Sequence, residues 1–174
     1  MTRQLRSLAA CVVLSLLFVP PARAQESIPS TFGHALKFTV LDPTTYAAPA
    51  LYYDATLRDW NTSQLFFRNG FVERNPRFTL SGLPGDTPLS YGAGRVQIAK
   101  DAFAVLGVSA VHNFSSQLLQ QSLQARYPEH RKLIAVLGWT ERIGVASLMS
   151  YRIAGPHYTQ WRRNQELAAQ LSLR

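Results

Sequence analysis

The chain has 174 residues, of which 47% are hydrophobic, and a formal net charge of +8. Its lysines and arginines are scattered, so we expect no basic stripe of the kind that binds nucleic acid. The single cysteine, Cys11, lies near the N-terminus, so no disulfide, thiol nucleophile or thiolate metal ligand is expected in the rest of the chain.

Residues 1–24 have the three parts of a cleaved export signal. Arg3 and Arg6 supply positive charge, and an apolar run from Leu8 to Val19 follows. This run is shorter than the about 20 residues that a membrane helix needs, which disfavours the alternative of an uncleaved anchor. Positions 22 and 24 hold alanine, so cleavage is expected before Gln25. We therefore expect export to the periplasm or inner membrane of a bacterium, with a charge of +5 after cleavage because three arginines are lost.

An irregular segment is expected over residues 25–43, where prolines and a glycine interrupt the pattern and Lys37–Leu41 is a short β-like run. Residues 44–174 are expected to form a single helical domain. Apolar residues there recur at spacings of three and four, which predicts helices near 46–69, 95–124 and 128–154.

A connection rich in proline and glycine separates the first two expected helices over residues 71–94. Gly155 and Pro156 are expected to end the third helix, and a basic amphipathic tail helix should follow them. The predicted fold is therefore all-α, a small bundle of three main helices and a C-terminal amphipathic helix.

The sequence leaves open whether the second and third helices cross a membrane. Charged residues interrupt both apolar stretches, including Glu141 and Arg142 in the third helix. Small residues lie one turn to either side of Arg142, so another helix could approach and supply a carboxylate. Asp59 or Asp54 is the expected partner, with Asp101 next. The alternative is that Arg142 lies on a solvated face.

A polar pattern follows the first expected helix into the connection, and its members are Asp59, Thr62, Gly70, Glu73, Asn75 and Pro76. In its D-x-x-T and G-x-x-E-x-N-P spacing, the chain resembles a group of small, uncharacterised bacterial envelope proteins. The resemblance covers roughly residues 45–155 in layout. It implies a multi-helix membrane protein and no settled activity.

Two interpretations of this pattern remain open. In the first, Asn75 caps a helix that begins at Pro76, Glu73 lies near that helix start, and Asp59 accepts a hydrogen bond from Thr62 or Ser63. In the second, Asp59 and Glu73 form a buried site for a cation or a proton, together with one of two histidines, His112 or His157.

The four histidines, His34, His112, His130 and His157, are never three or four residues apart, so no helical metal clamp is expected and no cofactor is implied. The pattern favours a non-enzymatic helical protein whose partner is membrane lipid or another envelope protein. The alternative is a hydrolase-like enzyme that binds a metal or a proton through Asp54, Asp59, Glu73 and His112.

Overall fold

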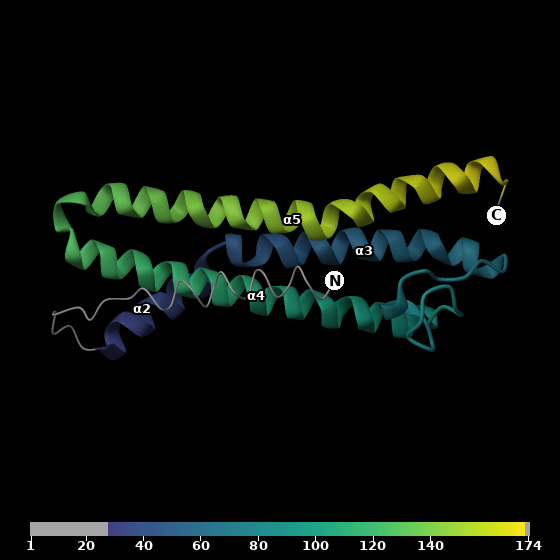
Figure 1. Ribbon diagram of the computed structural model, residues 1–174, viewed down its shortest axis with the longest axis horizontal. Coiled ribbons are helices and arrows are strands. Elements are labelled where there is room, and N and C mark those ends of the chain that lie inside the picture. The colour runs from purple at the N-terminus through teal and green to yellow at the C-terminus, as the bar shows by residue number, and fades with distance from the viewer. Residues whose placement is uncertain (1–27, 173–174) are drawn as a thin grey trace. The chain divides into compact units, whose positions relative to one another are not determined.

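The computed structural model describes residues 28–172, which are largely helical (Figure 1). Its long helices are α3 (Thr44–Arg68), α4 (Tyr91–Arg126) and α5 (Arg131–Gln170), and a shorter helix, α2 (Ile28–Leu41), precedes them. Two single-turn 3₁₀ helices, η1 (Pro76–Phe78) and η2 (Pro128–His130), lie in the connections. Within residues 28–172 there are two isolated β-bridges and no strand. The all-α prediction is therefore confirmed for this part of the chain, and the expected signal at residues 1–24 lies outside it.

The first expected helix is found at α3, and local signals explain both of its ends. Asp42 Oδ1 accepts hydrogen bonds from the Thr44 amide at 2.9 Å and the Thr44 hydroxyl at 2.7 Å, which caps the start. Gly70 follows the last turn with a φ of +84°, a conformation that glycine adopts without steric cost. The helix therefore ends where the sequence predicted.

The prediction of an irregular segment at residues 25–43 is wrong, because α2 occupies residues 28–41. The β-like run Lys37–Leu41 has no neighbouring strand with which to pair. A helix satisfies the same backbone groups locally, and the Thr39 hydroxyl adds a hydrogen bond of 2.9 Å to the Ala35 carbonyl one turn earlier.

The predicted end of the third helix at Gly155 and Pro156 is also wrong. The helix α5 continues through Pro156 to Gln170, so no separate tail helix exists. Proline in a helix interior removes one backbone hydrogen bond and commonly bends the helix. A bend is visible in the yellow-green part of α5 in Figure 1. Side-chain hydrogen bonds to α3 hold the part of α5 that follows Pro156.

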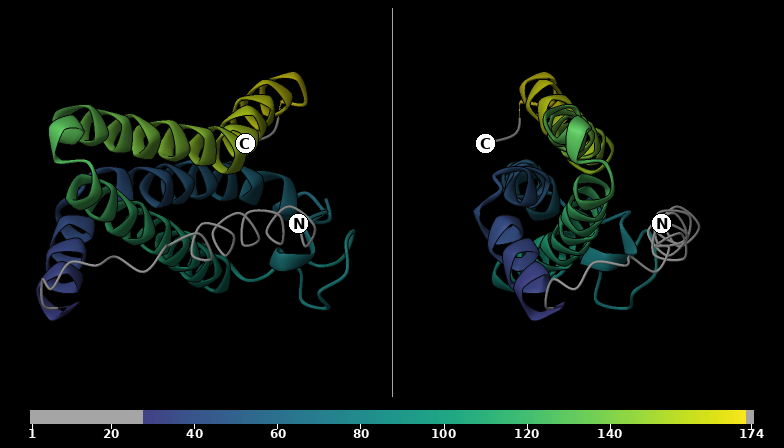
Figure 2. Two further views of the ribbon diagram at one scale, coloured as in Figure 1. Left: turned by 60° about the vertical axis from the view of Figure 1, so that its left-hand side comes forward. Right: turned by 90° about the vertical axis from the view of Figure 1, so that its left-hand side faces the viewer.

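Two compact units make up the chain. Unit 1 combines the chain up to Tyr46 with Gly107–Ala146, and unit 2 combines Ala47–Leu106 with Ser147–Arg174. In unit 1, the adjoining parts of α4 and α5 run side by side on either side of the tight connection at η2 (Figures 1 and 2).

Unit 2 contains the apolar core of the described chain, in which Trp60, Phe78 and Ile98 are buried. Leu57, Phe67 and Leu89 pack against this cluster. A side chain at Gly94 would overlap the Trp60 ring, so α4 can approach α3 only because this position is glycine. The connection between α3 and α4 thus contributes Phe78 to the core and is not a free loop.

Candidate functional site

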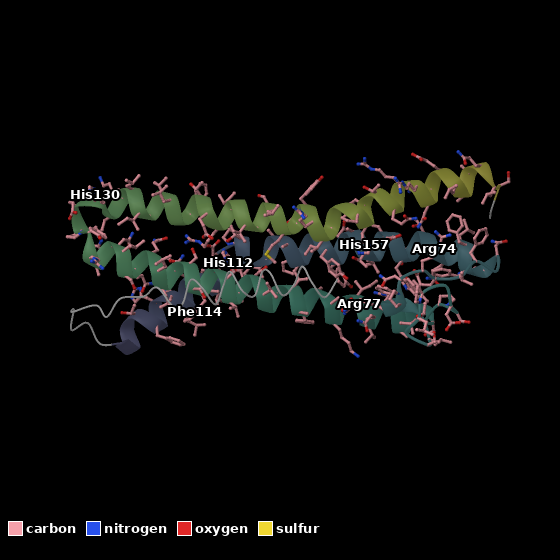
Figure 3. The ribbon with its side chains drawn as sticks, viewed as in Figure 1. Arg74, Arg77, His112, Phe114, His130 and His157 are labelled. Carbon is pink, nitrogen blue, oxygen red and sulfur yellow. The ribbon has the colours of Figure 1, made fainter. Side chains whose placement is uncertain are left out.

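A carboxylate and a histidine from different helices meet in unit 2. Asp59 lies on α3 and His157 on α5, and the Asp59 Oδ2 and His157 Nδ1 atoms are 2.9 Å apart. Figure 3 labels His157 on α5. Both side chains are largely covered, with exposed fractions of 16% and 22%. The geometry is that of a charge-assisted hydrogen bond.

Asn164, also on α5, holds the other oxygen of Asp59. Its Nδ2 lies 3.2 Å from Asp59 Oδ1, 3.3 Å from the Thr62 hydroxyl and 3.1 Å from the Ser63 hydroxyl. The Thr62 hydroxyl donates to the Asp59 backbone carbonyl at 2.9 Å. The expected hydrogen bond from Thr62 to Asp59 is therefore present, and its acceptor is the backbone carbonyl and not the carboxylate. Both carboxylate oxygens are already occupied by α5.

Tyr52 closes one side of this cluster. Its ring meets the His157 ring edge to face, with the ring centres 5.7 Å apart. The Tyr52 hydroxyl donates to Asp101 Oδ2 at 3.3 Å, and Asp101 also pairs with Arg77. Burial, together with the negative charge of Asp101, raises the pKa of Tyr52 to about 12. Tyr52 is therefore neutral, and its ring packs against His157 in a fixed position.

Glu73 lies in the connection after α3 and is half-buried. Its Oε1 accepts a hydrogen bond of 2.7 Å from the Asn75 amide. Burial raises the pKa of Glu73, and the negative charge of Asp59 adds to this rise while His157 opposes it. Glu73 is therefore coupled electrostatically to the Asp59–His157 pair.

The capping interpretation of Asn75 and Pro76 is confirmed. The Asn75 side chain accepts a hydrogen bond from the Arg77 amide, and Pro76 takes the first helical position. The helix that they begin is the single turn η1, not one of the long helices.

Asp54, another candidate, lies on an exposed face of α3, where it pairs with Arg58 at 2.8 Å and accepts a hydrogen bond from Tyr158.

Unit 1 contains a second polar cluster, built on the ion pair of Arg142 with Asp42. The Arg142 Nε and Asp42 Oδ2 atoms are 2.8 Å apart, and the exposed fractions of the two side chains are 6% and 9%. Arg142 Nη1 also donates to Gln120 Oε1 at 3.1 Å. The expectation that a carboxylate would pair with Arg142 is confirmed, but the expected partners Asp59, Asp54 and Asp101 are wrong. Those three belong to unit 2 and have partners there.

His112 is found in unit 1 beside Glu141, and Figure 3 labels it on α4. Its Nε2 lies 2.9 Å from Glu141 Oε1, close enough for an ion pair although the alignment is not that of a hydrogen bond. The structure therefore does not bring His112 together with Asp59 and Glu73. Of the two histidines considered for that site, His157 is the one that joins it.

The sequence interpretation missed Asn164 and Asp42, although each had a signal. Asn164 lies two helical turns after His157 and therefore on the same face of α5. Asp42 directly precedes Pro43 and Thr44, a typical start of a helix with a capping carboxylate. Among residues 28–172, no group of three or more His, Cys, Asp or Glu side chains is arranged to hold a metal ion.

Comparison with known proteins gave no match, since no family model, no curated protein and no solved structure is similar to this chain.

Proposed function

We propose that this protein is an exported, non-enzymatic helical protein that is embedded in the bacterial inner membrane through α4 and α5. In this proposal residues 1–24 direct export and are removed before Gln25. Lipid is the partner of the apolar helix faces. The polar interior of unit 1 is then shielded from lipid by the helices that carry it.

The low burial of the apolar helix stretches carries this proposal. Both α4 and the helical run Pro128–Gln170 are long and apolar enough to cross a membrane by length and composition. In each of them the apolar segment is 18 residues long. Only 17% of this segment is buried inside the protein in α4, and only 6% in Pro128–Gln170. The core helix of a water-soluble protein would bury most of such a segment. Residues 28–172 therefore leave most of these apolar stretches uncovered, and in this proposal lipid covers them.

Unit 1 shows the same reversal of polarity residue by residue. Its buried side chains include six polar or charged ones, Thr39, Thr45, Ser109, Asn113, Gln117 and Arg142. Large apolar side chains point outward from all three of its helices, among them Phe32, Leu36, Val111, Leu119, Leu133, Val136 and Trp139. Apolar groups gain nothing from facing water, whereas hydrocarbon accepts them and rejects the polar groups.

The lengths and charges of the two stretches fit a bilayer. Residues 102–125 of α4 contain no Asp, Glu, Lys or Arg, and their 24 residues give a helix of about 36 Å, enough for a hydrocarbon core of about 30 Å. In residues 133–151 of α5 the only such residues are Glu141 and Arg142. Arg142 is paired with Asp42 and buried, as an ionised group in a membrane requires.

A partner protein that covers the same apolar faces is the competing explanation. The hydrolase-like alternative has less support, because it needs His112 beside Asp59 and Glu73, whereas His112 lies beside Glu141 in unit 1.

Cysteine labelling tests the proposal, because the chain has a single native cysteine that can be removed as Cys11→Ala. In that background Val111→Cys and Val136→Cys probe the apolar faces of α4 and α5, and Leu83→Cys is the control in the connection before α4. All three positions are exposed in the structure. In open membrane sheets, where both water phases are accessible, a charged maleimide should label Leu83→Cys and spare the other two. Detergent denaturation should make all three reactive.

Equal labelling at the three positions in the intact membrane would overturn the proposal. Release of the protein from membranes by carbonate at high pH would also overturn it. If the two helix positions stayed protected after such release, a protein partner and not lipid would be the covering group.

A further inference from the structure

The orientation of the His157 ring leaves one of its nitrogens available. Asp59 Oδ2 lies 2.9 Å from Nδ1, and a carboxylate accepts but does not donate when ionised. Neutral His157 must therefore carry its proton on Nδ1, which leaves the lone pair on Nε2. Within residues 28–172 no hydrogen bond joins Nε2 to another protein atom, and 22% of the side chain is exposed.

Neighbouring groups fix both members of the pair. Tyr52 packs edge to face on the imidazole with an interplanar angle of 80°. Asn164, which is buried, donates to the second oxygen of Asp59. A ring held in this way keeps its Nε2 aimed in one direction, which is what proton transfer from a bound group requires.

We propose that His157 is a reversible proton-binding group, which accepts a proton at Nε2 from water or from a hydroxyl or amine group of a small polar ligand and returns it, with no other bond of that ligand broken. Asp59 is the positioning residue, which sets the tautomer and stabilises the imidazolium that forms. The step moves one proton from the donor oxygen or nitrogen to Nε2, and the donor keeps the electron pair. This inference goes beyond the proposed membrane function and does not depend on it.

Neither His112 nor His130 has an accessible Nε2 together with a carboxylate at Nδ1. His112 Nε2 is buried and lies 2.9 Å from Glu141 Oε1, so this nitrogen is not accessible to a ligand. His130 is 61% exposed, with Nε2 3.7 Å from its neighbour Glu129, and has the environment of a solvated histidine.

Asp59→Asn is the decisive variant, because it keeps the shape of the side chain but can present an amide N–H to Nδ1. The ring would then carry its proton on Nε2 and lose the base, as happens when the aspartate of a serine-protease triad is replaced by asparagine. Asp54→Asn is the matched control. It neutralises a carboxylate on the same helix that bonds Tyr158, the residue next to His157.

The measurement is the rate at which diethyl pyrocarbonate modifies each histidine of the full-length purified protein in detergent, resolved by peptide mass spectrometry at pH 8. We expect His157 to react in the parent protein, and Asp59→Asn to slow it by roughly tenfold or more. Asp54→Asn should leave that rate unchanged, and His130 should react equally in all three proteins.

Nitrogen-15 NMR of histidine-labelled protein gives a second readout, since it distinguishes the two neutral tautomers. The Nδ1–H form of His157 in the parent protein is expected. Finding the Nε2–H form, an unreactive His157 in the folded parent, or equal rates in Asp59→Asn and the parent would overturn the proposal. If Asp59→Asn loses its helical circular dichroism, the tautomer of the parent protein decides the question alone.

Discussion

The ion pair between Arg142 and Asp42 is the most deeply buried charge interaction of unit 1, with side-chain exposed fractions of 6% and 9%. A guanidinium in this position also bonds Gln120 and lies 3.5 Å from the Ser116 hydroxyl. Removal of one partner leaves the other charge buried and uncompensated, which costs about 3–5 kcal/mol in measured cases. The pair is therefore a stability determinant even if its net contribution is small.

Arg142→Ala should lower the free energy of unfolding by about 3–5 kcal/mol, measured by denaturant titration in detergent micelles. Asp42→Asn is the partner change, because asparagine can still cap α3 at Thr44. The double variant should lose less than the sum of the two single losses. Arg58→Ala, which breaks an exposed pair with Asp54, should change the free energy of unfolding far less than Arg142→Ala does. Additive losses for Arg142 and Asp42 would contradict the pairing.

For single residues, contacts between sequence neighbours could be predicted from the sequence, whereas partners distant in sequence could not. Asn75 and Pro76 were correctly predicted to begin a helix, since an N-cap followed by proline depends on adjacent residues alone. That Arg142 needs a carboxylate could also be predicted, because an apolar neighbourhood penalises an unpaired charge. Its partner Asp42 is 100 residues away in sequence, and only the packing of unit 1 selects it.

Among the helices, Gly138 of α5 lies against the end of a side chain of α4 in unit 1. A side chain at Gly138 would overlap Gln120 Oε1, the atom that accepts from Arg142. Gly144 lies on the same helix with open space around it, so it is a matched control. The two glycines thus separate the effect of close helix approach from the effect of helix propensity.

Gly144→Ala should stabilise the protein by about 0.5–1 kcal/mol, because alanine is the better helix former. Gly138→Ala has the same intrinsic gain but displaces Gln120 from Arg142, and a hydrogen bond to a charged group contributes about 1.5–3 kcal/mol. We therefore expect Gly138→Ala to destabilise the protein in denaturant titrations. In a Gln120→Ala background the same change should become stabilising. A stabilising Gly138→Ala in the parent protein would show that the Gln120 side chain moves aside without losing a hydrogen bond that matters for stability.

Helix existence followed from periodicity, whereas two helix boundaries did not. The apolar spacing of α3, α4 and α5 is a property of each segment, so their presence was predictable. Proline at position 156 would commonly end a helix. The helix α5 continues because two residues after Pro156, Tyr158 and Asn164, form hydrogen bonds to α3. The helix α2 was missed because its prolines and glycine predicted a break, although Pro29 lies in the first turn, where proline is tolerated, and Pro43 lies beyond the last residue.

For the molecule as a whole, the distribution of polarity separates a membrane protein from a soluble one more clearly than composition does. A hydrophobic fraction of 47% is ordinary for a soluble domain. In unit 1, however, the polar side chains Thr45, Asn113 and Gln117 are buried while Val136 and Trp139 are exposed. In the proposed membrane location, this arrangement places the apolar side chains in lipid and keeps the polar side chains away from it. The sequence alone left the membrane question open, because burial depends on which helix faces meet.

In the proposed function, the first 24 residues direct the whole molecule to the membrane. If they form a cleaved signal, protein isolated from the cell envelope begins at Gln25, which N-terminal sequencing or intact mass will show. Ala24→Arg places a large charged side chain at the position that the peptidase reads, so the precursor should accumulate uncut. Ala24→Ser keeps a small residue and is the matched control, which should be processed normally. An envelope protein that retains Met1 or Thr2 would contradict cleavage, and residues 8–19 would then act as an anchor that adds to α4 and α5.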